Sequence, residues 1–174
     1  MRRLLMGVLA LGLLVITVES ALAQRNPRAT TQISVGGKTV SVEYGRPSLK
    51  GRKVSELLDQ LKPGDVWRLG ADKSTTFSTA VDLQFGEAAV PSGEYSLWVA
   101  RAEGDSWKLV FNKQHGQWGT DHDAAQDLVS TPLKETKASS SAEMVTINLT
   151  KSGTGGAISI QWGEMKLTAS FKAK

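Results

Sequence analysis

The sequence contains no cysteine. This absence excludes disulfide bonds, a thiol nucleophile and a lipid anchor on cysteine, so an exported form must be held together by its core alone. Common enzyme motifs are also missing, because the chain has no Gly-x-Ser-x-Gly, no His-Glu-x-x-His and no phosphate-binding glycine loop. The net charge is only +4, and basic residues are interspersed with acidic ones. The composition therefore gives no indication of nucleic-acid binding.

The N-terminal stretch has the three-part pattern of a secretory signal. Two arginines precede an almost unbroken apolar run, Leu4 to Val18, and a small-x-small site follows and ends at Ala23. The apolar run is shorter than the about 20 residues that a membrane-spanning helix needs. We therefore expect a signal peptide over residues 1–23, cleavage after Ala23 and no membrane anchor afterwards.

The remainder has the length of one ordinary domain. We expect a flexible N-terminus over residues 24–30 and a single domain over residues 31–174. The small-x-small site is typical of bacterial export, which makes the periplasm or the cell exterior the expected location.

Period-two alternation of apolar residues predicts a mainly antiparallel β fold. The clearest case is a hairpin that places Tyr95, Leu97 and Val99 on one face, and Trp107, Leu109 and Phe111 on one face of the next strand. About nine or ten short strands at this spacing, with no β-α-β alternation, predict an all-β, single-domain antiparallel sandwich. The other expected strands lie within residues 31–44, 77–85, 88–90, 127–136, 145–149, 158–162 and 165–171.

Several local features refine this expectation. Leucine and valine spacing over Val54–Leu61 predicts one short helix, which is too short to be stable without the sheet. Residues 77–85 are expected to form one strand, and Pro132 predicts an edge position or a bulge. A polar, Ser-rich mobile tip is expected at residues 137–142, and a turn at Gly163-Glu164.

The loop after the hairpin holds the richest group of polar side chains. His115 and His122 flank Gln117 and Trp118, and Asp121 and Asp123 accompany them. Two imidazoles and two carboxylates would suit a metal ion, but their spacing matches no named metal motif. The same His and Asp residues could serve a hydrolase, whereas the alternative is a solvated polar loop with Trp118 packed beneath it.

A second group of polar side chains lies in two earlier loops. It consists of Tyr44, Arg46, Lys50 and Arg52, with Arg68 and Asp72 in the later loop. Arginine forks suit carboxylate, sulfate or phosphate groups, so one hypothesis is an anion pocket between the two loops. In the alternative, Arg46 or Arg68 is a structural arginine that binds loop carbonyls or a nearby aspartate.

The chain contains five tryptophans, and Trp98 is the one whose position is hardest to assign. It lies on the face of its strand opposite Tyr95 and Leu97. An exposed tryptophan on a sheet could stack against a sugar, whereas in a covered sandwich it would be buried.

Four segments in order resemble a known family. They are YGRPSLKGR at 44–52, VWRLGAD with TTF at 66–77, PSGEYSLW at 91–98, and WKLVFNK with QWGT at 107–120. Together they resemble the exported bacterial family catalogued as domain of unknown function 2911. The resemblance implies a compact, mainly β, exported domain and supplies no catalytic residues. Members of that family have Asn-Glu where this chain has Asp72-Lys73.

Two classes of function follow from these patterns. The first is a non-catalytic binding module for a sugar or a small anionic ligand of the cell envelope. Its candidate ligand-binding residues are Tyr44, Arg46, Arg52, Arg68, Asp72, His115, Trp118 and His122. The second is a hydrolase that uses His115 or His122 with Asp121 or Asp123, with His115, Asp121 and His122 as the candidate ligands if a metal assists. No cofactor is indicated, and the sequence leaves the oligomeric state open.

Overall fold

The computed structural model describes residues 26–174, so the expected signal peptide lies outside the described residues. No helix in the described part of the chain is long and apolar enough to cross a membrane. The fold has one short helix, α1 (Val54–Leu58), and 3-10 turns at Glu103–Asp105 and Ala124–Gln126. The strands are β1 (Arg28–Val35), β2 (Lys38–Gly45), β3 (Val66–Trp67), β4 (Thr76–Thr79), β5 (Leu83–Phe85), β6 (Ala88–Val90), β7 (Gly93–Arg101), β8 (Trp107–Asn112), β9 (Asp127–Ser152) and β10 (Gly155–Ala173).

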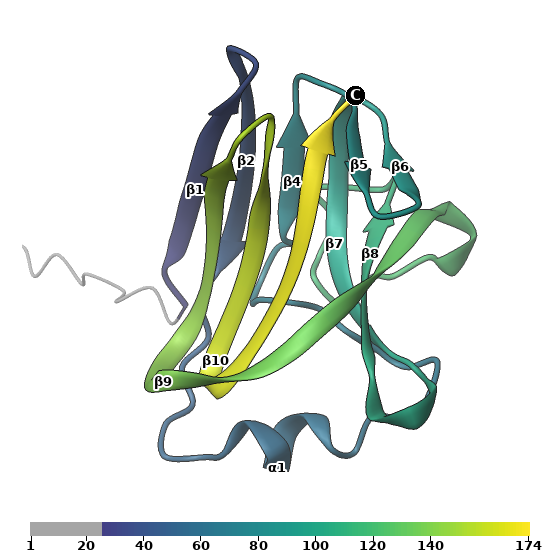
Figure 1. Cartoon of the computed structure of the whole chain (residues 1–174). Coiled ribbons are helices and arrows are strands. Elements are labelled where there is room, and N and C mark those ends of the chain that lie inside the picture. Colours follow the sequence, from purple (N-terminus) through teal and green to yellow (C-terminus); the bar gives the residue numbers. More distant parts are fainter. Residues whose placement is uncertain (1–25) are drawn as a thin grey trace, which may run out of the picture.

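The strands form an antiparallel sandwich, as the sequence predicts. Their order is β1-β2-β4-β7-β8-β9-β10-β5-β6, with β3 paired to β7. This path folds back on itself, so that β9 and β10 lie across the layer of β1, β2, β4 and β7 (Figure 1). The first strand begins at Arg28 and not at Thr31, because Arg28 already pairs with Gly45 of β2.

The core lies between the two layers and contains the predicted inward faces of β7 and β8. Leu97 pairs with Phe111 and Val99 pairs with Leu109, and all four side chains are buried. Phe111 lies 5.0 Å from Phe85 of the other layer, measured between ring centroids. The hairpin therefore supplies a large part of the apolar surface on which the layers pack.

Residues 77–85 are not one strand, which corrects the sequence-based expectation. Phe77 belongs to β4, which pairs with β2 and β7, whereas Phe85 belongs to β5, which pairs with β10 and β6. The chain passes from one layer to the other between them, and the Thr79 hydroxyl donates to the Val81 carbonyl in this crossing. Alternation does not reveal the change, because both phenylalanines point into the same core.

The last third of the chain forms two long bent strands. The Ser-rich segment at residues 137–142 belongs to β9, and Gly163-Glu164 is a bend within β10; neither is the expected tip or turn. The pairing of β9 with β10 is irregular here, since Gly163 faces Ala142 and Met165 faces Lys137. At Pro132, β9 has a neighbouring strand, β8, on one side only. The proline lacks a backbone N–H, but no strand on the other side needs that donor.

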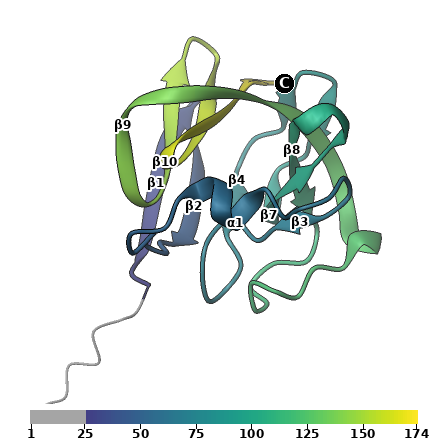
Figure 2. The same cartoon turned by 90° about the horizontal axis from the view of Figure 1, so that it is seen from below.

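Helix α1 closes one end of the sandwich (Figure 2). The helix begins where the Glu56 carboxylate accepts from the backbone N–H of Lys53 at 3.0 Å. It ends at Leu58, one turn before the predicted end at Leu61, and Leu61 N–H then donates to the Leu58 carbonyl. Leu58 is buried, while Leu57 and Leu61 are partly exposed along the same edge of the molecule.

Candidate functional site

The loop after β8, residues 113–126, packs on the outer face of the sheet and is called the exit loop below. Trp98 lies on that outer face and is only 2% exposed. Its ring contacts the imidazole of His122, at 4.7 Å between ring centroids. Trp98 is therefore buried beneath the exit loop, outside the main core between the layers.

Buried polar side chains attach the exit loop to the sheet. Ser96, which is fully buried, accepts a hydrogen bond from Trp98 Nε1 at 2.9 Å and another from Gln117 Nε2 at 3.3 Å. Gln117 Oε1 in turn accepts from the hydroxyl of Ser74, at 3.2 Å. Because unpaired buried polar groups are costly, this network defines one position for the loop.

The position of His122 depends on a second group of contacts. Its Nε2 lies 2.9 Å from Oδ1 of Asp127, the first residue of β9. Asn112, buried at the end of β8, donates to the same Asp127 oxygen at 2.7 Å and to the Asp123 carbonyl at 2.8 Å. An ionised carboxylate only accepts hydrogen bonds, so Asp127 requires a proton on Nε2 of His122.

The exit loop meets the segment 68–72 through backbone contacts. Gly119 N–H donates to the Asp72 carbonyl at 2.7 Å, and a Cβ added at Gly119 would lie 2.6 Å from that oxygen. Leu69 and Asp72 adopt left-handed backbone conformations, with φ of 40° and 62°. These conformations are rare for residues other than glycine and often occur at functional sites.

A pocket of about 260 Å³ lies between α1, this segment and the exit loop. Its polar side chains are those of Arg68, Thr120 and His122. Within the described residues, the guanidinium of Arg68 has no ion pair or hydrogen bond. The rest of the lining is Leu57, Leu58, Leu61, Val66, Trp67, Trp98 and Gly119.

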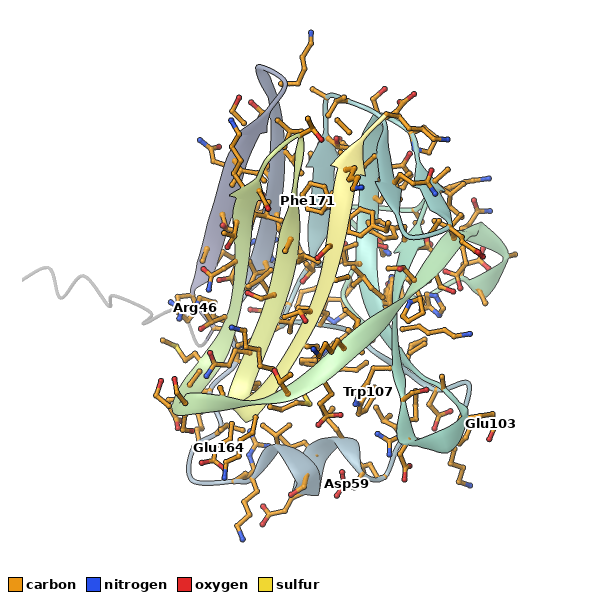
Figure 3. The ribbon with its side chains drawn as sticks, in the orientation of Figure 1. Arg46, Asp59, Glu103, Trp107, Glu164 and Phe171 are labelled. Carbon is orange, nitrogen blue, oxygen red and sulfur yellow. The ribbon has the colours of Figure 1, made fainter. Side chains whose placement is uncertain are left out.

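Three of the other candidate residues form their hydrogen bonds away from the pocket beside Arg68. Tyr44 is buried and donates to the Ile147 carbonyl at 3.2 Å. Arg46 donates from Nε to the Val145 carbonyl at 3.1 Å, and Figure 3 shows it on the opposite side of the molecule from Glu103. Arg52 donates to the Leu49 carbonyl at 2.8 Å within its own loop. The structure therefore does not bring these residues together with Arg68.

The residues around the two histidines are also spread out. His115 Nδ1 lies 3.9 Å from Glu94, whereas His122 contacts Asp127. Asp123 accepts from the Ala125 N–H and thereby begins a 3-10 turn. In residues 26–174, no three His, Cys, Asp or Glu side chains are grouped so that they could hold a metal ion.

Trp118 and Asp72 lie on the outer side of the contact between the exit loop and the segment 68–72. Trp118 is 53% exposed and pairs through its backbone with Lys73, so it does not pack beneath the loop. The Asp72 carboxylate lies 3.5 Å from the side-chain amide of Asn26. Trp118 thus remains available for an external contact, whereas Asp72 mainly supports the loop.

A larger cleft of about 820 Å³ lies on the other side of α1, where Figure 3 shows Asp59, Trp107 and Glu164. Its charged groups largely pair with one another or with neighbouring atoms. Lys137 lies 3.1 Å from Glu164, and Trp107 Nε1 donates to a Glu135 oxygen at 2.9 Å. The charged side chains of this cleft that lack such a partner in the described residues, Lys53 and Asp59, are exposed and of opposite sign.

The sequence analysis named Arg68 and His122 as candidates but not the residues that position His122 and the exit loop. Asp127 and Asn112 looked like ordinary strand-end residues, and Ser96 looked like an outward polar residue of a strand. One signal for Ser96 was available in the sequence: Ser96 lies two positions before Trp98, on the same face of the strand. A buried indole N–H needs an acceptor, and a serine hydroxyl at that position can supply it. Asp127 gave no comparable signal.

Comparison with known proteins identifies one family. A family model described as "Protein of unknown function (DUF2911)" matches residues 26–171, which is nearly all of the described chain. No curated protein and no solved structure gives a significant match. Since the family model covers well over half of the sequence, the chain belongs to the family of proteins of unknown function DUF2911.

Proposed function

We propose that this protein is an exported binding module that holds a small anionic ligand of the cell envelope in the pocket beside Arg68. Export rests on the signal-like pattern of residues 1–23. The observation that carries the binding function is that Arg68 lines this pocket with no ion pair or hydrogen bond in the described part of the chain.

The chemistry of Arg68 favours an anion. A guanidinium always carries charge and presents donors in a planar fork that matches carboxylate and phosphate oxygens. It lies against apolar side chains, where its charge is less well solvated and an anionic partner contributes more than in open water. His122 lines the same pocket.

Backbone strain next to Arg68 supports the same site. The left-handed conformation of Leu69, a buried residue without a glycine's freedom, costs about 1–3 kcal/mol. Thr75 stabilises this conformation by donating its hydroxyl to the Leu69 carbonyl. A costly conformation supported by a dedicated hydrogen bond is what we expect where a side chain must be held for a ligand.

A second candidate function rests on the contact of His122 with Asp127. A histidine oriented by a buried or half-buried carboxylate is the acid–base part of a hydrolase triad. The hydroxyl that lines the pocket belongs to Thr120, and it bonds to Asp121 at 3.4 Å, not to His122. The lack of a nucleophile beside His122 in the described residues favours binding over hydrolysis.

Isothermal titration with glucuronate, acetate, inorganic phosphate and uncharged glucose tests the proposal. We expect at least one anion to bind and glucose to bind more weakly, and Arg68→Met to abolish the difference. Lys73→Met is the matched control, because it removes one positive charge near the exit loop outside the pocket. Binding that is equal for all four compounds, or that survives Arg68→Met, would contradict the proposal. Hydrolysis of an ester substrate that His122→Gln abolishes would favour the hydrolase.

A further inference from the structure

The walls of the pocket beside Arg68 are mostly apolar. Three leucines from α1 and the residues after it, Leu57, Leu58 and Leu61, face Trp98 and Trp67 across the pocket. The polar lining is confined to Arg68, Thr120 and His122. We propose that the ligand is an amphipathic monoanion, with a carboxylate-like head at Arg68 and a compact apolar tail against the leucines. This inference rests on the proposed anion-binding function.

The leucines distinguish such a ligand from a sugar. Leu57 and Leu61 are only half-buried, as is Val54 at the start of the helix, whereas the fully exposed residues of the helical segment are polar. Sugar hydroxyls placed against these side chains would lose water without gaining hydrogen-bond partners, which is unfavourable. An apolar tail would instead complete the burial of both leucines.

The volume of the pocket limits the size of the tail. The pocket encloses about 260 Å³, and a water molecule occupies roughly 30 Å³ in the liquid. Because a methylene group is of similar size, the pocket holds about nine non-hydrogen atoms. A straight-chain carboxylate of about seven carbons, with its two oxygens, fits this limit.

The head group has one charged donor available. Arg68 can bind a carboxylate through two parallel N–H donors. His122 donates its Nε2 proton to Asp127, so the neutral ring keeps only an acceptor at its other nitrogen and contributes no hydrogen bond to a carboxylate. Arg68 lies at the polar part of the lining, so a single head group and a single tail account for the pocket.

A chain-length series tests this inference on the purified protein. Butanoate, hexanoate, octanoate and decanoate are titrated by calorimetry and by quenching of tryptophan fluorescence, since Trp67 and Trp98 line the pocket. We expect affinity to rise about fourfold per methylene, which corresponds to full burial, and to level off between about six and eight carbons. Octanamide, which keeps the tail without the charge, is expected to bind about tenfold more weakly than octanoate.

Two variants separate the head from the tail. Arg68→Met should remove the difference between octanoate and octanamide, whereas Lys73→Met should not. Leu57→Gln should flatten the chain-length series while leaving the affinity for acetate unchanged, because Leu57 is half-exposed and contributes little to the core.

The outcomes distinguish this inference from the proposed function. If glucuronate or phosphate binds through Arg68 and the alkanoates show no dependence on length, the anion site stands and the amphipathic ligand is overturned. If no anion binds, both proposals fail. If octanoate and octanamide bind equally well, the site is apolar only, and the role of Arg68 in both proposals is refuted.

Discussion

Replacing Arg46 should weaken the fold, whereas replacing Arg68 should not. Arg46 Nε donates to the Val145 carbonyl at 3.1 Å and its Nη2 donates to the Thr146 hydroxyl at 3.3 Å, so it ties the end of β2 to β9. A hydrogen bond from a charged donor contributes about 1.5–3 kcal/mol. Both distances lie at or beyond the long end of the usual range, so we expect Arg46→Met to cost about 2–3 kcal/mol in total.

Arg68 has no such partners in the described residues, and it is only half-buried. Substitutions away from specific interactions usually change stability by no more than about 0.5 kcal/mol. Arg68→Met should therefore leave the free energy of unfolding nearly unchanged while it abolishes anion binding. The two arginines are therefore expected to differ in their effect on stability, although both lie in loops.

Urea unfolding followed by tryptophan fluorescence measures the contrast. With a slope of about 2 kcal/mol per molar urea, Arg46→Met should lower the midpoint by roughly 1 M, and Arg68→Met by less than about 0.3 M. Arg46→Lys serves as the control, because it keeps the charge but not the planar fork, and it should fall between the two. Equal midpoints for Arg46→Met and the wild type would refute the structural role of Arg46. A loss as large in Arg68→Met would refute the view that Arg68 is free for a ligand.

Three further predictions concern the exit loop, a loop–strand contact and the core. Gly119→Ala should weaken anion binding and lower the melting temperature, because the alanine Cβ would lie 2.6 Å from the Asp72 carbonyl oxygen. Unchanged binding would show that the close approach of Gly119 to Asp72 does not position the pocket. The Ser48 hydroxyl and then a backbone N–H hold the pKa of the Glu143 carboxyl below its usual value, so Ser48→Ala should raise that pKa in a carboxyl-carbon NMR titration. The contribution of Glu143 to stability is present above the usual glutamate pKa and is lost as the pH falls through the lowered pKa of Glu143. A Glu143 pKa that is the same in Ser48→Ala as in the wild type would contradict this assignment. Phe111→Ala should cost about 3–5 kcal/mol in chemical denaturation, since the ring is fully buried among other aromatic rings, and a loss below about 1 kcal/mol would show that the core relaxes around the cavity.

Arg46 and Arg68 have different surroundings for a physical reason. Arginines in irregular loops either hold backbone carbonyls or face a ligand, and their residue type is the same in both cases. Arg46 lies next to the long strand β9 and finds carbonyl partners 99 residues away in sequence. Arg68 faces a pocket formed by three separate segments, and only their packing decides that it meets His122.

The sequence by itself determined the sandwich, the inward faces of the hairpin and the family. Alternation of apolar residues is a local property, and it directly reports which side chains face the core. It also singled out the exit loop and Arg68 as chemically rich places.

Only the tertiary structure decided which of those residues lie together. The passage of residues 77–85 between the layers, the continuity of β9 and β10, and the burial of Trp98 under the exit loop depend on contacts between distant segments. The same is true of Asp127, which orients His122 from the start of β9. Hydrogen bonds and packing across such separations leave no periodic pattern in the chain, and so the pocket beside Arg68 became apparent only once the strands were in place.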